Sequence, residues 1–289
     1  SFVRLLSDSN THQVMNPEGS SLQKSRQTCT CLNQTTILGR SGQTFISERI
    51  AIGPMASPHN SKRARTDQSK MQHLSKSLCL VLRHKAIELG LPMTNDGFVP
   101  VQEILKLSKF LKFTVEDIRQ VVESNDKQRF KLQTRPSTDF YSTAVGNNNE
   151  MMILCIRANQ GHSIPNIDPN LLLERLTSDE LAALPTVIVH GTYLDAWKRI
   201  RTQGLKRMTR NHIHFAAGLP GENGVISGMR KSCEVFVYID ANKCAEDGIV
   251  FYRSDNGVLL TAGVDDKGIL PVKYFDRVTN KDGEMMEWC

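Results

Sequence analysis

The chain has 289 residues, of which 39% are hydrophobic, and this is enough apolar material for one or two domains of ordinary size. No apolar run approaches the roughly 18 residues that a membrane-spanning helix needs, so no membrane partner is expected. The net charge is +6, but residues 1–70 hold nine Lys/Arg against four Asp/Glu, which leaves the rest of the chain nearly neutral. Seven scattered cysteines without a C-x-x-C pair argue for a reducing compartment and against structural zinc or a disulfide framework.

Residues 1–70 are rich in Ser, Thr, Gln and Asn, poor in acids, and lack a sustained hydrophobic period. Such a segment buries too little apolar surface to fold, so we expect a disordered tail. Its acid-poor, Arg- and Ser-containing composition resembles an organellar transit peptide, whereas Lys62-Arg63-Ala64-Arg65 is equally compatible with a short nuclear signal. The expected location is intracellular, in the cytoplasm or nucleus, with organellar import as the alternative.

A first lobe is expected over residues 71–178. Leu74, Leu78, Val81 and Leu82 recur at the spacing of one helix face, and Gly90 is placed to end that helix. The elements expected next are a turn and short strand over Asn95–Val101, a helix over Val101–Leu107, a helix from Thr114 with Asp117 in a capping box, a strand at Arg129–Leu132, an inserted loop near Pro136–Glu150 and a strand at Met151–Arg157. Helices interrupted by short strands indicate a winged-helix-like lobe.

A second lobe is expected over residues 179–289, where short apolar segments alternate with turn residues in a pattern typical of a strand-rich domain and not of a βαβ repeat. The expected elements are a strand at Val187–His190, a helix at Asp195–Thr202 closed by Gly204, and strands at Ile213–Phe215, Glu234–Asp240, Gly248–Tyr252, Val258–Thr261 and Ile269–Tyr274. The predicted fold class is α+β.

Two stretches of the first lobe have side chains suited to an anionic ligand. Arg83-His84-Lys85 offers a guanidinium beside a group that titrates near neutrality, although a basic helix end that favours the macrodipole explains the same residues. The segment Ile156–Ser163 turns from a strand into consecutive hydrogen-bonding residues opened by Gly161, which suits a polar ligand or a plain turn about equally. Arg129, at the start of a strand, is by itself an ordinary surface residue.

Two motifs of the second lobe also admit a functional and a structural interpretation. His190-Gly191-Thr192 directly follows an apolar strand, where the glycine either lets a ligand approach the backbone or ends the strand. His212 and His214 share one strand face at a spacing that can ligate metal, but a third ligand of credible spacing is missing, so no metal is expected.

Charge in the second lobe is concentrated between Trp197 and Lys231, where eight Lys/Arg accompany a single acid, Glu222. This indicates either a polyanion-binding surface or a solvated face. The glycine-rich loop Gly218–Gly228 matches neither the G-x-G-x-x-G of a Rossmann fold nor a P-loop, so neither of those nucleotide sites is predicted.

Taken in order, these motifs resemble those of the tRNA 2′-phosphotransferase family. The matching stretches are Leu74-Ser75-Lys76, Leu82-Arg83-His84, Asp96-Gly97, Asp126–Phe130, Arg157–Ser163, His190-Gly191-Thr192, Arg210–His214 and Gly228–Lys231. Residues 1–70 and the 136–150 loop lie outside the resemblance.

The resemblance implies a winged-helix RNA lobe, an NAD-binding lobe similar to ADP-ribosyltransferases, and an active site between them. It also implies a reaction in which the splice-junction 2′-phosphate of ligated tRNA attacks the nicotinamide ribose of NAD+, giving an ADP-ribosylated 2′-phospho-RNA. The ribose 2″-hydroxyl then releases 2′-hydroxyl tRNA and ADP-ribose 1″,2″-cyclic phosphate, as the last step of tRNA splicing. NAD+ is consumed as a co-substrate, nicotinamide is the other product, and the enzyme is expected to be a monomer.

Site residues carry over by their match to the family motifs. Arg83, Arg129 and Arg210 match the catalytic arginines, which hold phosphate charge without a metal, and His84 matches the catalytic histidine, a general base toward the ribose hydroxyl. The NAD+ pocket is expected to contain His190, Gly191, Thr192, Asn211 and His212. The phosphate or RNA side is expected to contain Lys85, Arg157, Gln160, His162 and Arg230.

Two alternatives stay open. An ADP-ribosyltransferase acting on nucleic-acid ends or on protein would share the second lobe but would not need Arg83-His84 for phosphate removal. A non-enzymatic winged-helix RNA-binding module would leave the polar motifs of the second lobe unexplained, and failure to release nicotinamide would support it.

Overall fold

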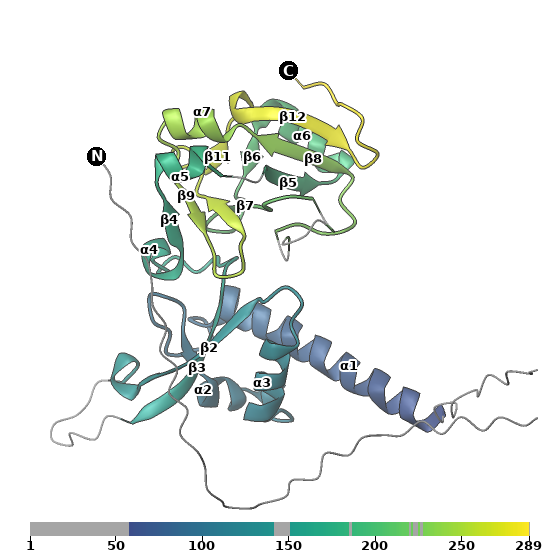
Figure 1. Cartoon of the computed structure of the whole chain (residues 1–289). Coiled ribbons are helices and arrows are strands. Elements are labelled where there is room, and N and C mark those ends of the chain that lie inside the picture. Colours follow the sequence, from purple (N-terminus) through teal and green to yellow (C-terminus); the bar gives the residue numbers. More distant parts are fainter. Residues whose placement is uncertain are drawn as a thin grey trace, which may run out of the picture. The chain divides into compact units, whose positions relative to one another are not determined.

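The computed structural model describes residues 58–141, 151–184, 187–219, 221, 225 and 228–288 (Figure 1). These residues belong to one unit, Ala56–Cys289. The expectations for residues 1–57 lie outside the described residues.

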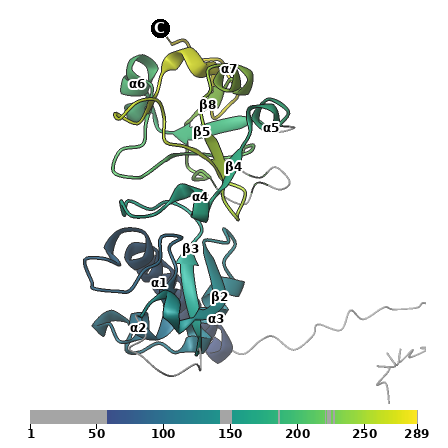
Figure 2. The same cartoon turned by 90° about the vertical axis from the view of Figure 1, so that its left-hand side faces the viewer.

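The first part of this unit packs helices around an antiparallel sheet. Its elements are α1 (Pro58–Leu80), a π-helical turn (Val81–Lys85), β1 (Val99–Pro100), α2 (Val101–Leu105), a 3-10 turn (Ser108–Phe110), α3 (Val115–Glu123), β2 (Phe130–Pro136), a 3-10 turn (Ser137–Asp139) and β3 (Met152–Ala158). The strand order is β1-β3-β2, so β3 lies in the middle. Figures 1 and 2 show α2 and α3 beside this sheet.

The first helix differs from the expectation at both ends. It begins at Pro58, so residues 58–70 are helical and the predicted tail was wrong there. The stretch holds two Lys and two Arg, which are good helix formers, but it has no apolar stripe, and hydrophobic periodicity therefore does not reveal it. At the other end, the α-helix stops at Leu80 and continues as the π-helical turn before Gly90, at φ +68°, ends the segment.

The start of α3 confirms the predicted capping box. The Asp117 backbone N–H donates to Thr114 Oγ1 at 3.2 Å, and the Thr114 backbone N–H donates to Asp117 Oδ2 at 2.9 Å. Strand β2 extends further than predicted, to Pro136. The inserted loop therefore starts later than expected, and residues 142–150 of it lie outside the described residues.

The second part of the unit is rich in short strands. Its elements are α4 (Pro169–Leu172), β4 (Glu174–Leu176), α5 (Ser178–Ala182), β5 (Ile188–Thr192), α6 (Leu194–Gln203), β6 (Leu205–Lys206), β7 (Ile213–Phe215), β8 (Val235–Ile239), α7 (Ala241–Glu246), β9 (Phe251–Arg253), β10 (Leu259–Thr261), β11 (Ile269–Leu270), a 3-10 turn (Val272–Tyr274) and β12 (Phe275–Asn280).

Small antiparallel sheets organise this part, with the strand orders β4-β9-β10-β7, β12-β8-β5 and β11-β6. Val189 of β5 and Ala216, just after β7, exchange backbone hydrogen bonds of 3.0 and 2.9 Å, which brings the His190 and His212–His214 motifs side by side. Together with the first sheet, this confirms the α+β class. The strand expected over Ile269–Tyr274 is instead divided at Pro271, which cannot donate to a ladder.

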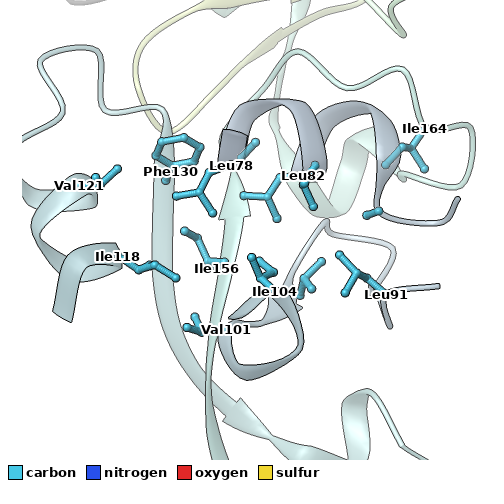
Figure 3. Close-up of a cluster of buried hydrophobic side chains, with 14 of the residues drawn as sticks. Leu78, Leu82, Leu91, Val101, Ile104, Ile118, Val121, Phe130, Ile156 and Ile164 are labelled. Carbon is cyan, nitrogen blue, oxygen red and sulfur yellow. The ribbon is translucent and has the colours of Figure 1, made fainter. Parts of the chain in front are cut away.

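Two large buried clusters form the core. The first gathers residues between Leu74 and Leu173, and Figure 3 shows Leu78, Leu82 and Ile156 within it. The second begins at Leu176. The β9–β10 hairpin belongs to both, because Val258 and Leu260 lie in the first cluster and Leu259 lies in the second, as the alternation of a strand requires. The division at residue 178 stays a prediction, as do the winged-helix and ADP-ribosyltransferase-like assignments.

Candidate active site

A cavity of about 840 Å³ brings together segments that are far apart in the sequence. Its walls come from the π-helical turn, the α3–β2 turn, the end of β3, the strands β5 and β7, the helix α6, and the segments 204–210 and 228–233. The lining includes no Asp or Glu among the described residues, and it includes eight basic residues: Arg83, Lys127, Arg129, Arg199, Lys206, Arg207, Arg210 and Arg230.

The charge of these eight side chains is not neutralised by acids in the described part of the chain. None of them forms an ion pair there, whereas basic residues elsewhere, such as Arg135 and Lys273, do. The cavity is therefore strongly positive and suited to a ligand that carries several negative charges.

Arg83 is partly buried at the wall of the cavity. Its Nε and Nη2 atoms are buried without a hydrogen-bond partner among the described residues. Burial lowers the pKa of Arg83, and the nearby charges of Arg210 and Arg129 lower it further. The guanidinium lies against Gly161, where a Cβ atom would come within 3.3 Å of Cζ and Nη1. A buried, unpaired guanidinium is costly, and an anion bound against it would relieve that cost.

The other two predicted arginines reach the same cavity from different elements. Asn125 Oδ1 accepts hydrogen bonds from the backbone N–H of Arg129 at 3.1 Å and from its Nη1 at 3.2 Å, which fixes the turn after α3. Arg210 lies at the exposed rim, and desolvation followed by the charge of Arg230 lowers its pKa. Three guanidinium groups thus converge on a cavity whose described lining holds no acid.

His84 lies beside this cluster and is exposed, outside the cavity lining. Its Nδ1 is 2.9 Å from Ser163 Oγ, and the Ser163 backbone N–H donates to the Arg83 carbonyl at 2.9 Å. Desolvation lowers the pKa of His84, and the positive charges of Arg83, Arg210 and Lys85 lower it further. The imidazole is therefore neutral near pH 7 and able to accept a proton.

The motif His190-Gly191-Thr192 lines the cavity along β5. His190 Nδ1 donates to the His214 carbonyl at 2.9 Å, so its Nε2 is left as an acceptor. Burial lowers the pKa of His190. A Cβ atom at Gly191 would lie 2.8 Å from Cys233 Sγ and 2.9 Å from Met229 Sδ, so the 228–233 segment packs closely only because this residue is glycine.

His212, just before β7, and His214, within it, also line the cavity. Burial lowers the pKa of His212 to about 4 and moves the pKa of His214 well below its ordinary value. His214 Nε2 is buried without a partner among the described residues. Both rings are neutral at physiological pH and offer hydrogen bonds without adding positive charge.

Comparison with known proteins identifies the family. Residues 68–263 match the model of the RNA 2′-phosphotransferase, Tpt1 / KptA family. The chain belongs to this family of RNA 2′-phosphotransferases.

Relatives cover most of the same region. The chain is 50% identical to tRNA 2′-phosphotransferase 1 of Danio rerio over 74% of its own length and 87% of the relative's. It is 47% identical to tRNA 2′-phosphotransferase 1 of Homo sapiens, over 72% and 76% of the two chains. It is 35% identical to tRNA 2′-phosphotransferase of Saccharomyces cerevisiae, over 72% and 83%. The chain is therefore an enzyme, a phosphotransferase.

Some residues predicted for the site of this phosphotransferase lie apart from the cavity. Arg157 is buried, pairs with Asp255 at 3.0 Å and stacks on Phe98. Lys85 pairs with Glu88. His162 is 3% exposed, and neither of its ring nitrogens has a partner among the described residues.

Asn211 lies next to the cavity but does not line it. Its backbone N–H donates to the His162 carbonyl and its Nδ2 donates to the Ile164 carbonyl, each at 2.9 Å. Asn211 thus ties the start of β7 to the segment after β3. Of the residues predicted for the RNA side, Gln160 and Arg230 line the cavity.

One wall of the cavity, which α6 provides, was not predicted from the sequence. Its contributing residues, Ala196, Arg199, Ile200 and Gln203, follow the i, i+3, i+4, i+7 spacing of one helix face. That spacing is visible in the sequence, but a helix face that carries Arg and Gln is ordinarily exposed to solvent. The spacing alone therefore did not identify this face as part of the site. Lys127 and His214 were likewise not assigned to the site.

The described residues contain no group of three or more His, Cys, Asp or Glu arranged to hold a metal ion. They also contain no helix that is both long enough and apolar enough to cross a membrane.

Proposed function

We propose that this phosphotransferase removes the splice-junction 2′-phosphate of ligated tRNA and transfers it to NAD+. The observation that carries the proposal is the Arg83 guanidinium, with Nε and Nη2 buried without a partner among the described residues, at the wall of a cavity with eight basic side chains and no acid among those residues. The names of the relatives, tRNA 2′-phosphotransferases of vertebrates and yeast, supply the substrate.

The phosphate site is built from Arg83, Arg129 and Arg210. The Arg83 guanidinium lines the cavity, and a guanidinium binds phosphate most strongly when two of its N–H groups donate to two phosphate oxygens. Arg129 and Arg210 add positive charge where the phosphate charge is redistributed during transfer. The order α1, β1, α2, α3, β2, β3 around a β1-β3-β2 sheet is compatible with the winged-helix RNA lobe that would deliver this phosphate.

The rest of the cavity fits a dinucleotide. Its volume lies within the range of small-molecule sites, roughly 300–1,000 Å³, and His190, Thr192, His212 and His214 line it with polar groups. When bound, NAD+ supplies an electrophilic ribose carbon and nicotinamide as a neutral leaving group. The lowered pKa values of these histidines keep the rings uncharged, so they hydrogen-bond without repelling a cationic pyridinium.

His84 is proposed as the general base toward the ribose hydroxyl. To accept a proton at Nε2, the neutral ring must carry its hydrogen on Nδ1 and donate it to Ser163 Oγ, 2.9 Å away. Ser163 would thereby set the tautomer. The exposure of His84 agrees with a role that begins once the substrate covers it.

The test is to incubate the protein with a short RNA that carries one internal 2′-phosphate, with and without NAD+, and to analyse the products by mass spectrometry. We expect NAD+-dependent loss of phosphate and formation of ADP-ribose 1″,2″-cyclic phosphate. An RNA that only gains ADP-ribose would favour an ADP-ribosyltransferase, and an unchanged RNA would contradict the proposal.

Variants separate the roles in the same assay. Arg83→Ala should lose phosphate transfer, and His84→Ala should bind NAD+ normally while failing to release phosphate. Arg175→Ala is the matched control, because Arg175 is exposed on β4 and does not line the cavity. Normal turnover by Arg83→Ala or His84→Ala would contradict the assigned roles.

A further inference from the structure

The turn that carries Arg129 lies between α3 and β2, outside any helix or strand. Its conformation is unusual, because Gln128 has φ +43°, a left-handed conformation that residues other than glycine rarely adopt. Such a turn persists only when its surroundings hold it. The position of the Arg129 guanidinium in the cavity therefore depends on what fixes this backbone.

Three successive carbonyl groups of the turn accept hydrogen bonds from outside it. Asn159 donates from its backbone N–H to the Arg129 carbonyl at 2.9 Å and from Nδ2 to the Gln128 carbonyl at 2.7 Å. Asn256 Nδ2 donates to the Lys127 carbonyl at 2.8 Å. Asn159 follows β3 in the same part of the chain, whereas Asn256 comes from the β9–β10 hairpin.

Asn256 is itself held firmly. It is 3% exposed, and its Oδ1 accepts a hydrogen bond from Ser254 Oγ at 2.8 Å. A flipped amide would set two oxygens, Oδ1 and the Lys127 carbonyl, against each other, so the chemistry fixes which end of the amide faces the turn.

The hairpin that carries Asn256 is anchored on both sides of it. Asp255 pairs with Arg157 and with Lys131 of β2, and Val258 is fully buried in the first core cluster. The side chain of Lys127 makes a second contact with the second part of the chain, because Lys127 Nζ donates a hydrogen bond to the Met229 carbonyl at 3.0 Å. The tip of the hairpin thus contacts the turn directly. Figure 1 shows this hairpin reaching from the second part of the unit toward β2.

We propose that Asn256 is a positioning residue for phosphate transfer, which fixes the Lys127–Arg129 turn and so holds the Arg129 guanidinium at the phosphate. The inference rests on the proposed function, because it takes Arg129 as a phosphate-binding residue. Asn256 does not line the cavity, so it acts through the turn and not on the substrate.

The test compares kinetics of wild type, Asn256→Ala, Arg129→Ala and the double variant on the 2′-phosphorylated RNA with NAD+. A small displacement of a positioned group costs up to roughly 100-fold in rate, and we expect Asn256→Ala to lower kcat about 10- to 100-fold with little change in the KM for NAD+. Because Asn256 acts through Arg129, the double variant should be no slower than Arg129→Ala alone.

The matched control is Thr261→Val in the same hairpin. Thr261 is 1% exposed, and its Oγ1 donates to the Val250 carbonyl at 2.8 Å, so the variant loses a buried hydrogen bond away from the turn. Its Tm should fall like that of Asn256→Ala while its kcat stays near the wild-type value.

The outcomes are distinguishable. An inactive wild type would contradict the proposed function itself. With an active wild type, the inference about Asn256 is overturned by an unchanged kcat in Asn256→Ala, by a further loss in the double variant that multiplies the two single losses, or by an equal kcat loss in Thr261→Val.

Discussion

At the scale of single residues, Gly161 sets how closely the backbone approaches the Arg83 guanidinium. Its φ of +91° and the 3.3 Å distance that would separate an added Cβ from Arg83 Cζ make two separate demands for glycine. The first is conformational strain. The second is space, because an added methyl group would contact the Arg83 guanidinium. The Arg83 side chain is flexible and can move away at little cost in stability, but the guanidinium would then no longer occupy its position in the cavity.

We predict that Gly161→Ala lowers stability by about 1 kcal/mol and also lowers kcat by roughly tenfold or more, because Arg83 is displaced. Gly90→Ala is the matched control: its φ is +68°, and nothing lies within 4 Å of the added methyl group, so it should lower stability and leave kcat unchanged. Urea denaturation and steady-state kinetics check both. Equal kcat values in the two variants would show that Gly161 does not determine the position of the Arg83 guanidinium.

His162 adds a pH dependence to folding. Burial lowers its pKa to about 3, and the charges of Arg83 and Arg157 contribute, whereas an unfolded chain has a histidine pKa of about 6.5. Between these values the unfolded state binds more protons, so the stabilisation is complete above about pH 6.5 and is lost as the pH falls.

We predict that His162 alone makes the wild type lose about 2 kcal/mol of unfolding free energy between pH 7 and pH 5. His162→Gln should lose correspondingly less over the same interval, because glutamine does not titrate, while His212 and His214 continue to contribute. Urea denaturation of both proteins at the two pH values is the measurement. Identical pH dependence in both would show that His162 is protonated alike in the folded and unfolded states.

Sequence motifs predicted many residues of the cavity, but they did not predict which residues of each motif line it. Arg83, Arg129, Arg210, His190, Gly191, Thr192 and His212 all line it. Arg157 and His162 stand in the same motif as Gln160, but only Gln160 lines the cavity. Arg157 lies in β3 and the other two residues follow that strand, so only the fold decides which of them meets the cavity. Asn256 gave no signal at all, because Ser-Asp-Asn-Gly is an ordinary turn sequence.

At the scale of elements, helix capping was predictable because it is local. The Thr114–Asp117 box depends on residues three apart, and both of its hydrogen bonds form. The π-helical turn at Val81–Lys85 was not predictable, because an apolar stripe continues across it and conceals the local change in winding. Such turns are frequent at functional sites, and this one carries Arg83 and His84.

We predict that Thr114→Ala lowers the free energy of unfolding by about 1 kcal/mol, the usual value of an N-cap, without changing the KM for either substrate, because α3 reaches the cavity only through the turn after it. Chemical denaturation and kinetics are the measurements. Ser108→Ala, at an exposed position of the 3-10 turn after α2, controls for loss of a hydroxyl, and a loss in Ser108→Ala as large as in Thr114→Ala would count against the cap.

At the scale of the whole described unit, the sequence suggested two lobes, and the structure shows how their cores are joined. Along the β9–β10 hairpin, successive buried residues alternate between the two clusters, with Val258 and Leu260 in the first and Leu259 in the second. Asp255 and Asn256 add polar contacts from the hairpin tip. This pairing was beyond sequence analysis, because its contacts join residues that are 98 and 129 positions apart.

A shared hairpin implies that the two clusters unfold together in one cooperative transition. Trp197 and Trp288, the two tryptophans of the chain, pack in the second cluster, so their fluorescence reports on it. Circular dichroism at helix wavelengths instead reports mainly on α1, α2 and α3, which hold most of the described α-helical residues and whose buried Leu74, Ile104 and Ile118 belong to the first cluster. The two signals should therefore give the same midpoint in urea.

Leucine substitutions make this test decisive. Leu260→Ala opens a cavity in the first cluster and should cost about 2–5 kcal/mol, yet we predict that it shifts the tryptophan midpoint as far as the dichroism midpoint. Leu270→Ala, at an equally buried leucine of the second cluster, should likewise shift the dichroism midpoint as far as the tryptophan midpoint. If each substitution shifted only the midpoint of the signal from its own cluster, the two clusters would unfold independently. The hairpin could then not fix the position of the Arg129 turn relative to the rest of the cavity.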